Sequence, residues 1–133
     1  MDTTLENILL HVSLSPVLDS GDSEAGELLL LHACRNGLGI ARVSLWCFDD
    51  QRNLITCEQL LDHDEKPGCE KSTFYRRDLP AYFDALDHQR VIRAVDAHNH
   101  PATAEFTASY LIPSNIVSML DVPIRFGGEM IGI

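Results

Sequence analysis

Residues 40–61 read IARVSLWCFDDQRNLITCEQLL, and this stretch decides the fold. β-Branched, aromatic and other apolar residues dominate both of its halves, which is typical of strands. A polar segment, residues 49–53, separates the halves and is short enough for a hairpin connection. Because both faces of residues 40–48 are largely apolar, we expect that strand to be covered on both sides. The pattern therefore predicts paired strands over 40–48 and 54–61 within a covered sheet.

Two helices are predicted upstream of this hairpin. The first carries an apolar stripe at Leu5, Ile8, Leu9 and Val12. The second is expected to begin at a cap, Asp22 or Ser23, and to end at Asn36-Gly37. Because the first stripe has little to cover within the chain, we expect residues 1–21 to act as a dimerisation element.

Downstream of the hairpin, helices and strands alternate. Residues 62–71 are mostly charged and indicate a solvated loop, and Asp78 is the expected N-cap of a helix that starts with Pro80. The remaining predictions are a strand over 91–95, a helix from Thr103 through Tyr110, a long strand over 116–126, a tight turn at Gly127-Gly128 and a final strand over 129–133. The order α-α-β-β-α-β-α-β-β predicts an α+β fold, an α/β/α sandwich with a central, mostly antiparallel sheet and helices on both faces.

Composition restricts the partners. The 133 residues, enough for one domain, include 10 Lys and Arg against 20 Asp and Glu, a formal net charge of −10. Such an acidic surface disfavours nucleic acids and anionic lipids. No apolar run approaches the ~18–20 residues of a membrane-spanning helix, and the first residues lack the positive segment of a signal peptide. We therefore expect a cytoplasmic protein with no nucleic-acid or membrane partner.

Short motifs follow one another in a characteristic order. They are Arg42-Val43-Ser44-Leu45-Trp46, the Asp49-Asp50 turn, Pro80-x-Tyr82-Phe83-x-x-Leu86, Asp96-Ala97, Tyr110-Leu111, the segment from Ser118 to Ile124, Gly127-Gly128 and Ile131-Gly132. This ordered set resembles the GAF domain, a small sensory module of signalling proteins. It is most similar to a bacterial subgroup found in the sensor regions of histidine kinases and of diguanylate cyclases or phosphodiesterases. Complete members usually carry one more strand and a C-terminal helix, so the resemblance implies that residues 22–133 are a C-terminally truncated GAF-like domain.

The resemblance implies regulation and not catalysis. GAF domains generally bind a small ligand between the sheet and the helices over it, often as homodimers, and signal to a fused output domain, here in two-component or cyclic-di-GMP signalling. The sequence does not name the ligand or any cofactor, because the residue patterns of the family's cyclic-nucleotide and bilin sites are absent. The alternative is a ligand-free dimerisation or interaction module with a filled core.

The candidate ligand-binding residues are Arg42, Trp46, Tyr82, Phe83, Tyr110 and Met119. Arg42 and Trp46 lie four residues apart on one strand face, where a guanidinium and an aromatic wall suit an anionic ligand. The alternative is that Trp46 is core and Arg42 pairs with Asp96 or Asp121. For Phe83, Tyr110 and Met119 the alternative is ordinary core packing, and for Tyr82 it is partial burial without a ligand.

Catalytic and metal sites are not expected. Asp96, His98 and His100 alternate in sequence, but they fall in a turn where alternation does not place side chains together. Some GAF relatives are thiol enzymes that reduce free methionine sulfoxide, and they need a depressed thiol pKa in a basic setting. The four cysteines, Cys34, Cys47, Cys57 and Cys69, form no CxxC pair, and acidic residues lie near Cys47 and Cys69. We therefore expect free thiols, no catalytic residue and no metal.

Overall fold

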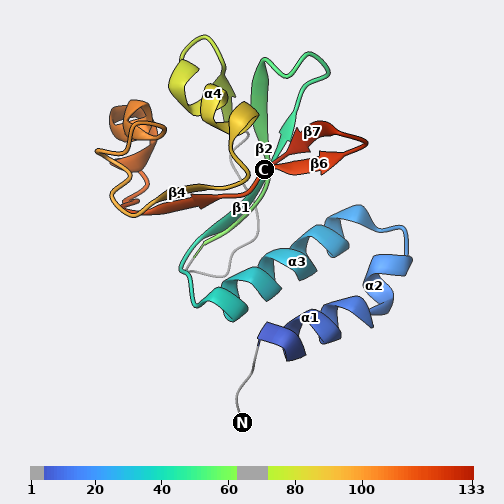
Figure 1. Cartoon of the computed structure of the whole chain (residues 1–133). Coiled ribbons are helices and arrows are strands. Elements are labelled where there is room, and N and C mark those ends of the chain that lie inside the picture. The colour runs from blue at the N-terminus through green and yellow to red at the C-terminus, as the bar shows by residue number, and fades with distance from the viewer. Residues whose placement is uncertain (1–4, 63–71) are drawn as a thin grey trace. The chain divides into compact units, whose positions relative to one another are not determined.

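The computed structural model describes residues 5–62 and 72–133 (Figure 1). The helices are α1 (Leu5–Ser13), α2 (Pro16–Asp19), α3 (Ser23–Leu38) and α4 (Pro80–His88), followed by the 3₁₀ helix η1 (Ala104–Phe106) and the π-helix η2 (Thr107–Leu111). The strands are β1 (Val43–Phe48), β2 (Leu54–Leu61), β3 (Thr73–Tyr75), β4 (Ile92–Ala94), β5 (Met119–Asp121), β6 (Ile124–Phe126) and β7 (Glu129–Gly132). These elements form two compact units: the first is Met1–Trp46 with Cys57–Ser72, and the second is Cys47–Thr56 with Thr73–Ile133.

The main sheet has five strands in the order β3-β2-β1-β7-β6 (Figure 1). β3 pairs antiparallel with β2, β7 with β1, and β6 with β7. A separate antiparallel ribbon joins β4 to β5. The predicted α+β fold with an antiparallel sheet is confirmed.

The central hairpin forms where the sequence places it. β2 matches the predicted bounds, and β1 starts at Val43, three residues later than expected. The Asp49 side chain fixes the connection, because its Oδ1 accepts hydrogen bonds from the backbone N–H groups of Asn53 and Leu54 at 2.7 and 3.1 Å. Such bonding is the reason that Asp is favoured in turns.

In the first unit, α3 begins as predicted but ends later. Asp22 Oδ1 accepts from the Ala25 N–H at 3.1 Å, so Asp22 is the N-cap. The predicted end at Asn36-Gly37 is wrong, because the helix continues to Leu38. Gly39 takes the left-handed conformation, with φ of 64°, and closes the last turn onto Arg35 O.

In the second unit, α4 starts at Pro80 as predicted and Thr103 occupies the N-cap position of η1, but neither predicted side-chain cap forms. Asp78 does not cap α4, because Leu79 occupies the N-cap position and makes no side-chain cap bond. The predicted helix from Thr103 is instead η1 followed by η2. The buried Thr103 hydroxyl donates to Ala97 O at 2.7 Å, so it is not available as a cap.

The predicted long strand over 116–126 is interrupted. β5 ends at Asp121 and pairs with β4, whereas β6 starts at Ile124 and pairs with β7. Pro123 lies between them and has no N–H to give to a ladder, which explains the break. The predicted turn at Gly127-Gly128 is confirmed, with φ of 59° and 81°.

Candidate functional site

Three aromatic rings of the second unit pack around the ring of Phe106. The Phe106 ring centroid lies 4.6 Å from Tyr82, 5.0 Å from Phe74 and 5.7 Å from Tyr110. Phe74 and Tyr110 also contact each other, with centroids 5.3 Å apart. We call Phe74, Tyr82, Phe106 and Tyr110 the aromatic cluster. Most of its pairs are edge-to-face, the arrangement that ring quadrupoles favour.

Each ring comes from a different element, β3, α4, η1 or η2. Tyr82 and Phe106 are each only 2% exposed, whereas Phe74 and Tyr110 are half-buried. The cluster therefore has a buried base and two rings that reach solvent.

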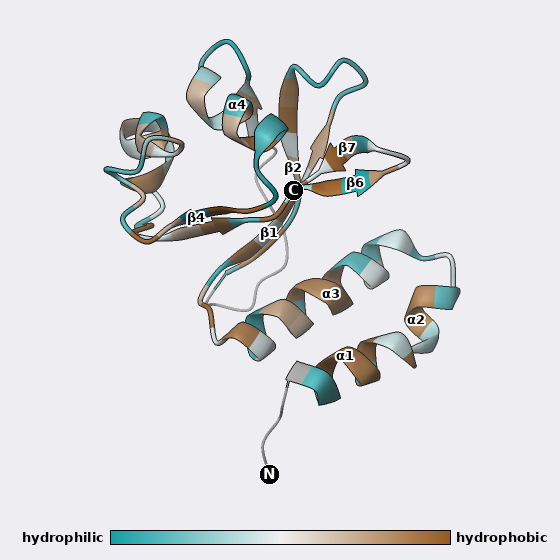
Figure 2. Cartoon of the chain, in the orientation of Figure 1, coloured by the Kyte–Doolittle hydropathy of each residue, from teal (hydrophilic) through white to brown (hydrophobic). Residues whose placement is uncertain are grey.

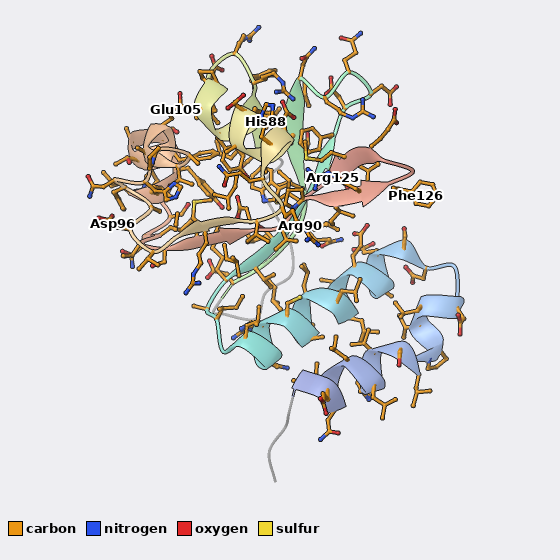
Figure 3. The ribbon with its side chains drawn as sticks, in the orientation of Figure 1. His88, Arg90, Asp96, Glu105, Arg125 and Phe126 are labelled. Atoms are coloured by element: carbon orange, nitrogen blue, oxygen red, sulfur yellow. The ribbon has the colours of Figure 1, made fainter. Side chains whose placement is uncertain are left out.

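α4 is fixed at its start by a side chain from η1. Glu105 Oε1 accepts hydrogen bonds from the N–H groups of Ala81 and Tyr82, at 2.9 and 3.3 Å (Figure 3). A carboxylate at a helix N-terminus both satisfies free N–H groups and interacts favourably with the helix dipole. Glu105 thereby sets the position of Tyr82 from a segment that also supplies Phe106.

β5 adds a carboxylate to the cluster. Asp121 pairs with Ile92 and Met119 with Ala94 in the β4–β5 ribbon, and both partners are fully buried. Asp121 and Met119 are half-buried on this inner face, while Leu120 points the other way and is 55% exposed. The Tyr82 hydroxyl donates a hydrogen bond to Asp121 Oδ2.

Burial governs the electrostatics of this pair. Burial raises the pKa of Asp121, and the Tyr82 hydrogen bond only partly opposes that rise. Burial, and then the charge of Asp121, raise the pKa of Tyr82 well above 10.0, so its hydroxyl stays protonated. Within the part of the chain that the structure describes, no Lys, Arg or His pairs with Asp121.

Two of the predicted binding residues lie in the aromatic cluster, a third lies two positions from Asp121 on β5, and a fourth contacts Tyr82. Tyr82 and Tyr110 belong to the aromatic cluster, and Met119 lies beside Asp121 on the inner face of β5. Phe83 is fully buried, with its ring centroid 5.8 Å from that of Tyr82, and the Arg76 guanidinium lies 5.0 Å from its ring. Phe83 therefore supports the cluster from within the core.

Sequence reasoning missed Phe74 and Phe106, and it considered Asp121 only as a partner for Arg42. The signal for Asp121 was available, because an acid that alternates with Met119 in an apolar strand shares its inward face. No comparable signal marks Phe74 or Phe106, which lie 32 positions apart in the chain and meet only through folding.

The other two predicted residues belong to the first unit. Arg42 Nη1 lies 3.2 Å from Asp62 Oδ2, so the suggested partners Asp96 and Asp121 are wrong. Trp46 is 8% exposed, and its Nε1 donates to Ser44 Oγ at 2.8 Å. The indole is thus satisfied within its own strand.

The histidine turn holds its side chains in separate bonds. His98 has a ring nitrogen 2.9 Å from Ile116 O, His100 Nδ1 accepts from Ala102 N–H at 3.0 Å, and Asp96 accepts from Asn99. Over residues 5–62 and 72–133, no group of three or more His, Cys, Asp or Glu side chains could hold a metal ion.

The structure describes three of the four cysteines. Cys34 is exposed, Cys47 half-buried and Cys57 buried. Cys69 and most of the charged loop over 62–71 lie outside the described residues.

Comparison with known proteins assigns the family. The model of the GAF domain matches residues 29–133, so the chain belongs to the GAF family of sensory and regulatory modules. No curated protein matches the sequence. Among the described residues, no helix is both long and apolar enough to cross a bilayer.

Solved structures share the fold at low identity. The phycoerythrobilin-bound GAF domain of a cyanobacterial phytochrome has a TM-score of 0.74 and 18% identity, over 99% of this chain and 79% of that one. A methyl-accepting chemotaxis protein gives 0.71 and 18%, over 95% and 78%. Free methionine-R-sulfoxide reductase from Neisseria meningitidis, in complex with its substrate, gives 0.65 and 15%, over 96% and 66%.

Proposed function

We propose that the chain is a non-catalytic sensor domain that binds a small molecule at the aromatic cluster and signals to a fused output domain. One observation carries the proposal. A half-buried carboxylate, Asp121, lies against a cluster whose Phe74 and Tyr110 rings reach solvent. Such a combination of apolar walls and a few fixed polar groups is what small-molecule sites present.

Similar structures support a ligand role for this fold. The phytochrome GAF domain carries phycoerythrobilin, and the Neisseria reductase holds its substrate. Other similar structures come from a chemotaxis protein and from the phosphoenolpyruvate-protein phosphotransferase of Coxiella burnetii, which fits a signalling or regulatory parent protein. The resemblance of the sequence favours a bacterial two-component or cyclic-di-GMP system in the cytoplasm, with the domain as a homodimer.

The proposed mechanism is a shift between conformations. A ligand that contacts Tyr82 and Tyr110 touches both α4 and η2, and Glu105 connects η1 to the start of α4. A ligand shifts an equilibrium only by its difference in affinity for the two states. Binding would therefore favour the arrangement in which these segments are held together.

Native mass spectrometry of the protein purified from its own host tests the proposal. We expect a small molecule to leave the protein on activation, and a small-molecule extract of the host to raise the melting temperature of ligand-free protein. Tyr110→Ala should abolish both effects, whereas Tyr75→Ala, an exposed β3 tyrosine outside the cluster, should not. A wild-type protein that carries nothing and ignores the extract would contradict the proposal.

A ligand-free interaction module is the second candidate. α1 exposes Leu9 and Leu10 at 58% and 57%, Leu14 directly after it is 73% exposed, and Figure 2 shows how much of the helix is apolar. A helix this apolar is expected to pack against a partner. If self-association were the only function, the chain would dimerise through α1 and bind no small molecule.

A further inference from the structure

We infer that the ligand of the aromatic cluster carries a positively charged nitrogen, such as a primary ammonium, which pairs with Asp121 beside the aromatic rings. This inference rests on the proposed function and names its ligand class. The carboxylate, and not the rings, indicates the charge of the ligand, because aromatic rings alone accept most apolar ligands.

Within the described residues, the Asp121 carboxylate accepts fewer hydrogen bonds than it can. An ionised carboxylate offers about four lone-pair positions, and Tyr82 uses one of them, at Oδ2. Over the described residues, no hydrogen bond reaches Asp121 Oδ1. Asp121 is half-buried.

Three arginines of the second unit, Arg76, Arg125 and Arg93, have other partners or face away from Asp121. Arg76 donates to Arg52 O at 3.0 and 2.8 Å and to Asp87 at 2.7 Å. Arg125, labelled in Figure 3, donates to Leu86 O at 3.2 Å. Arg93 pairs with Leu120 on the outer face of the β4–β5 ribbon and is exposed. Within the described residues, no arginine, lysine or histidine therefore supplies Asp121 with a positive charge.

The surrounding groups favour a cation over other ligands. The faces of Tyr and Phe rings attract cations, and a desolvated contact strengthens that attraction. An anion would be repelled by Asp121, and a neutral ligand would remove water from the carboxylate without replacing its counter-charge. Within the described residues, the ionisable group that contacts Asp121 is Tyr82 from α4, whose raised pKa keeps its hydroxyl protonated.

Three probes of similar size test the charge preference: benzylammonium, benzyl alcohol and phenylacetate. Their dissociation constants are measured by chemical-shift titration of the ¹⁵N-labelled full chain. We expect benzylammonium to bind roughly tenfold or more tightly than benzyl alcohol, since a hydrogen bond to a charged group contributes ~1.5–3 kcal/mol. Phenylacetate should not bind.

Three variants test whether Asp121 causes the preference for the cationic probe. Asp121→Asn keeps an oxygen for the Tyr82 hydroxyl and should reduce benzylammonium affinity to that of benzyl alcohol. Asp96→Asn, an exposed carboxylate labelled in Figure 3, should change nothing. Tyr82→Phe retains the carboxylate and should keep the preference for the cation, which covers the case in which Asp121→Asn fails to fold.

Failure of the cation inference can be distinguished from failure of the proposed sensor function. Equal binding of benzylammonium and benzyl alcohol, unaffected by Asp121→Asn, overturns the cation inference and leaves the aromatic ligand site standing. No binding of any probe, together with a Tyr110-dependent response to host extract, also overturns it. If neither probes nor extract act on the protein, the proposed sensor function fails as well.

Discussion

At the scale of single residues, the fold determines chemistry that the sequence only partly indicates. Tyr82 and Tyr110 were predictable because each lies in a short motif with recognisable helical spacing. Phe106 was not, because its role depends on rings from three other elements. An isolated aromatic residue in a polar segment gives no information about distant neighbours.

The raised pKa of Asp121 predicts a pH-dependent stability. The folded-state pKa lies above the ordinary value of 3.8, so the folded protein binds a proton that the unfolded chain releases. The resulting stability is fully present below the unfolded pKa and is lost as the pH rises through the folded pKa. The Asp121→Asn variant should therefore gain stability relative to wild type as the pH rises through that folded-state pKa. The measurement is the difference in free energy of unfolding between the two proteins, determined with urea at several pH values. A constant difference would contradict this prediction.

Thr103 offers a test of a buried hydrogen bond. Its side chain is fully buried, and Oγ1 donates to Ala97 O at 2.7 Å. Thr103→Val keeps the shape and leaves that carbonyl without its donor, so we expect the free energy of unfolding to fall by ~1–3 kcal/mol. Thr107→Val is the matched control, because Thr107 is half-buried and its bond to His98 O is long, at 3.5 Å. Equal losses in the two variants would count against the assignment.

At the scale of elements, local signals predicted the bonds that a segment makes with itself better than those it receives from a distant residue. The hairpin over β1 and β2 was predictable because its turn bonds are made by Asp49, within the segment itself. The start of α4 was not, because its N–H groups are satisfied by Glu105 and not by the nearby Asp78. The break between β5 and β6 had a visible cause in Pro123, which the expectation of one long strand passed over.

The Glu105 cap is testable at this scale. Glu105→Ala should lower the free energy of unfolding by ~0.5–2 kcal/mol, the usual range for loss of a helix cap. Glu105→Gln retains an acceptor oxygen and should recover most of this loss, apart from its interaction with the helix dipole. Amide hydrogen exchange at Ala81 and Tyr82 would show whether the effect is local. Unchanged exchange at both sites in Glu105→Ala would exclude the cap.

At the scale of the molecule, the order of elements was sufficient to predict the α+β class and the antiparallel sheet. The periodicity of apolar residues carries that information, since it reports which faces are buried. Periodicity does not say what covers an apolar face. The predicted stripe on α1 illustrates this limit, because Val12 is buried at 8% while Leu9 is 58% exposed.

At this scale we predict that the chain self-associates through α1. If α1 is a dimer contact, replacing Leu10 and Leu14 together by Glu should convert the protein to a monomer at tens of micromolar, because buried charge without a partner is unfavourable. Phe126→Glu is the control, since Phe126 is 79% exposed and projects from β6 in Figure 3. Analytical ultracentrifugation gives the readout. A wild-type chain that is already monomeric would rule out α1 as a dimer contact at that concentration.

The bond between Glu105 and the start of α4 also has a consequence for how the chain acquires its shape. The acceptor lies 24 residues downstream of the first N–H group that it serves. On a ribosome, the front of this helix would therefore leave the exit tunnel before its acceptor does. Its first turn should remain frayed until the later segment emerges, so any nascent chain cut short of residue 105 would lack an intact first turn there.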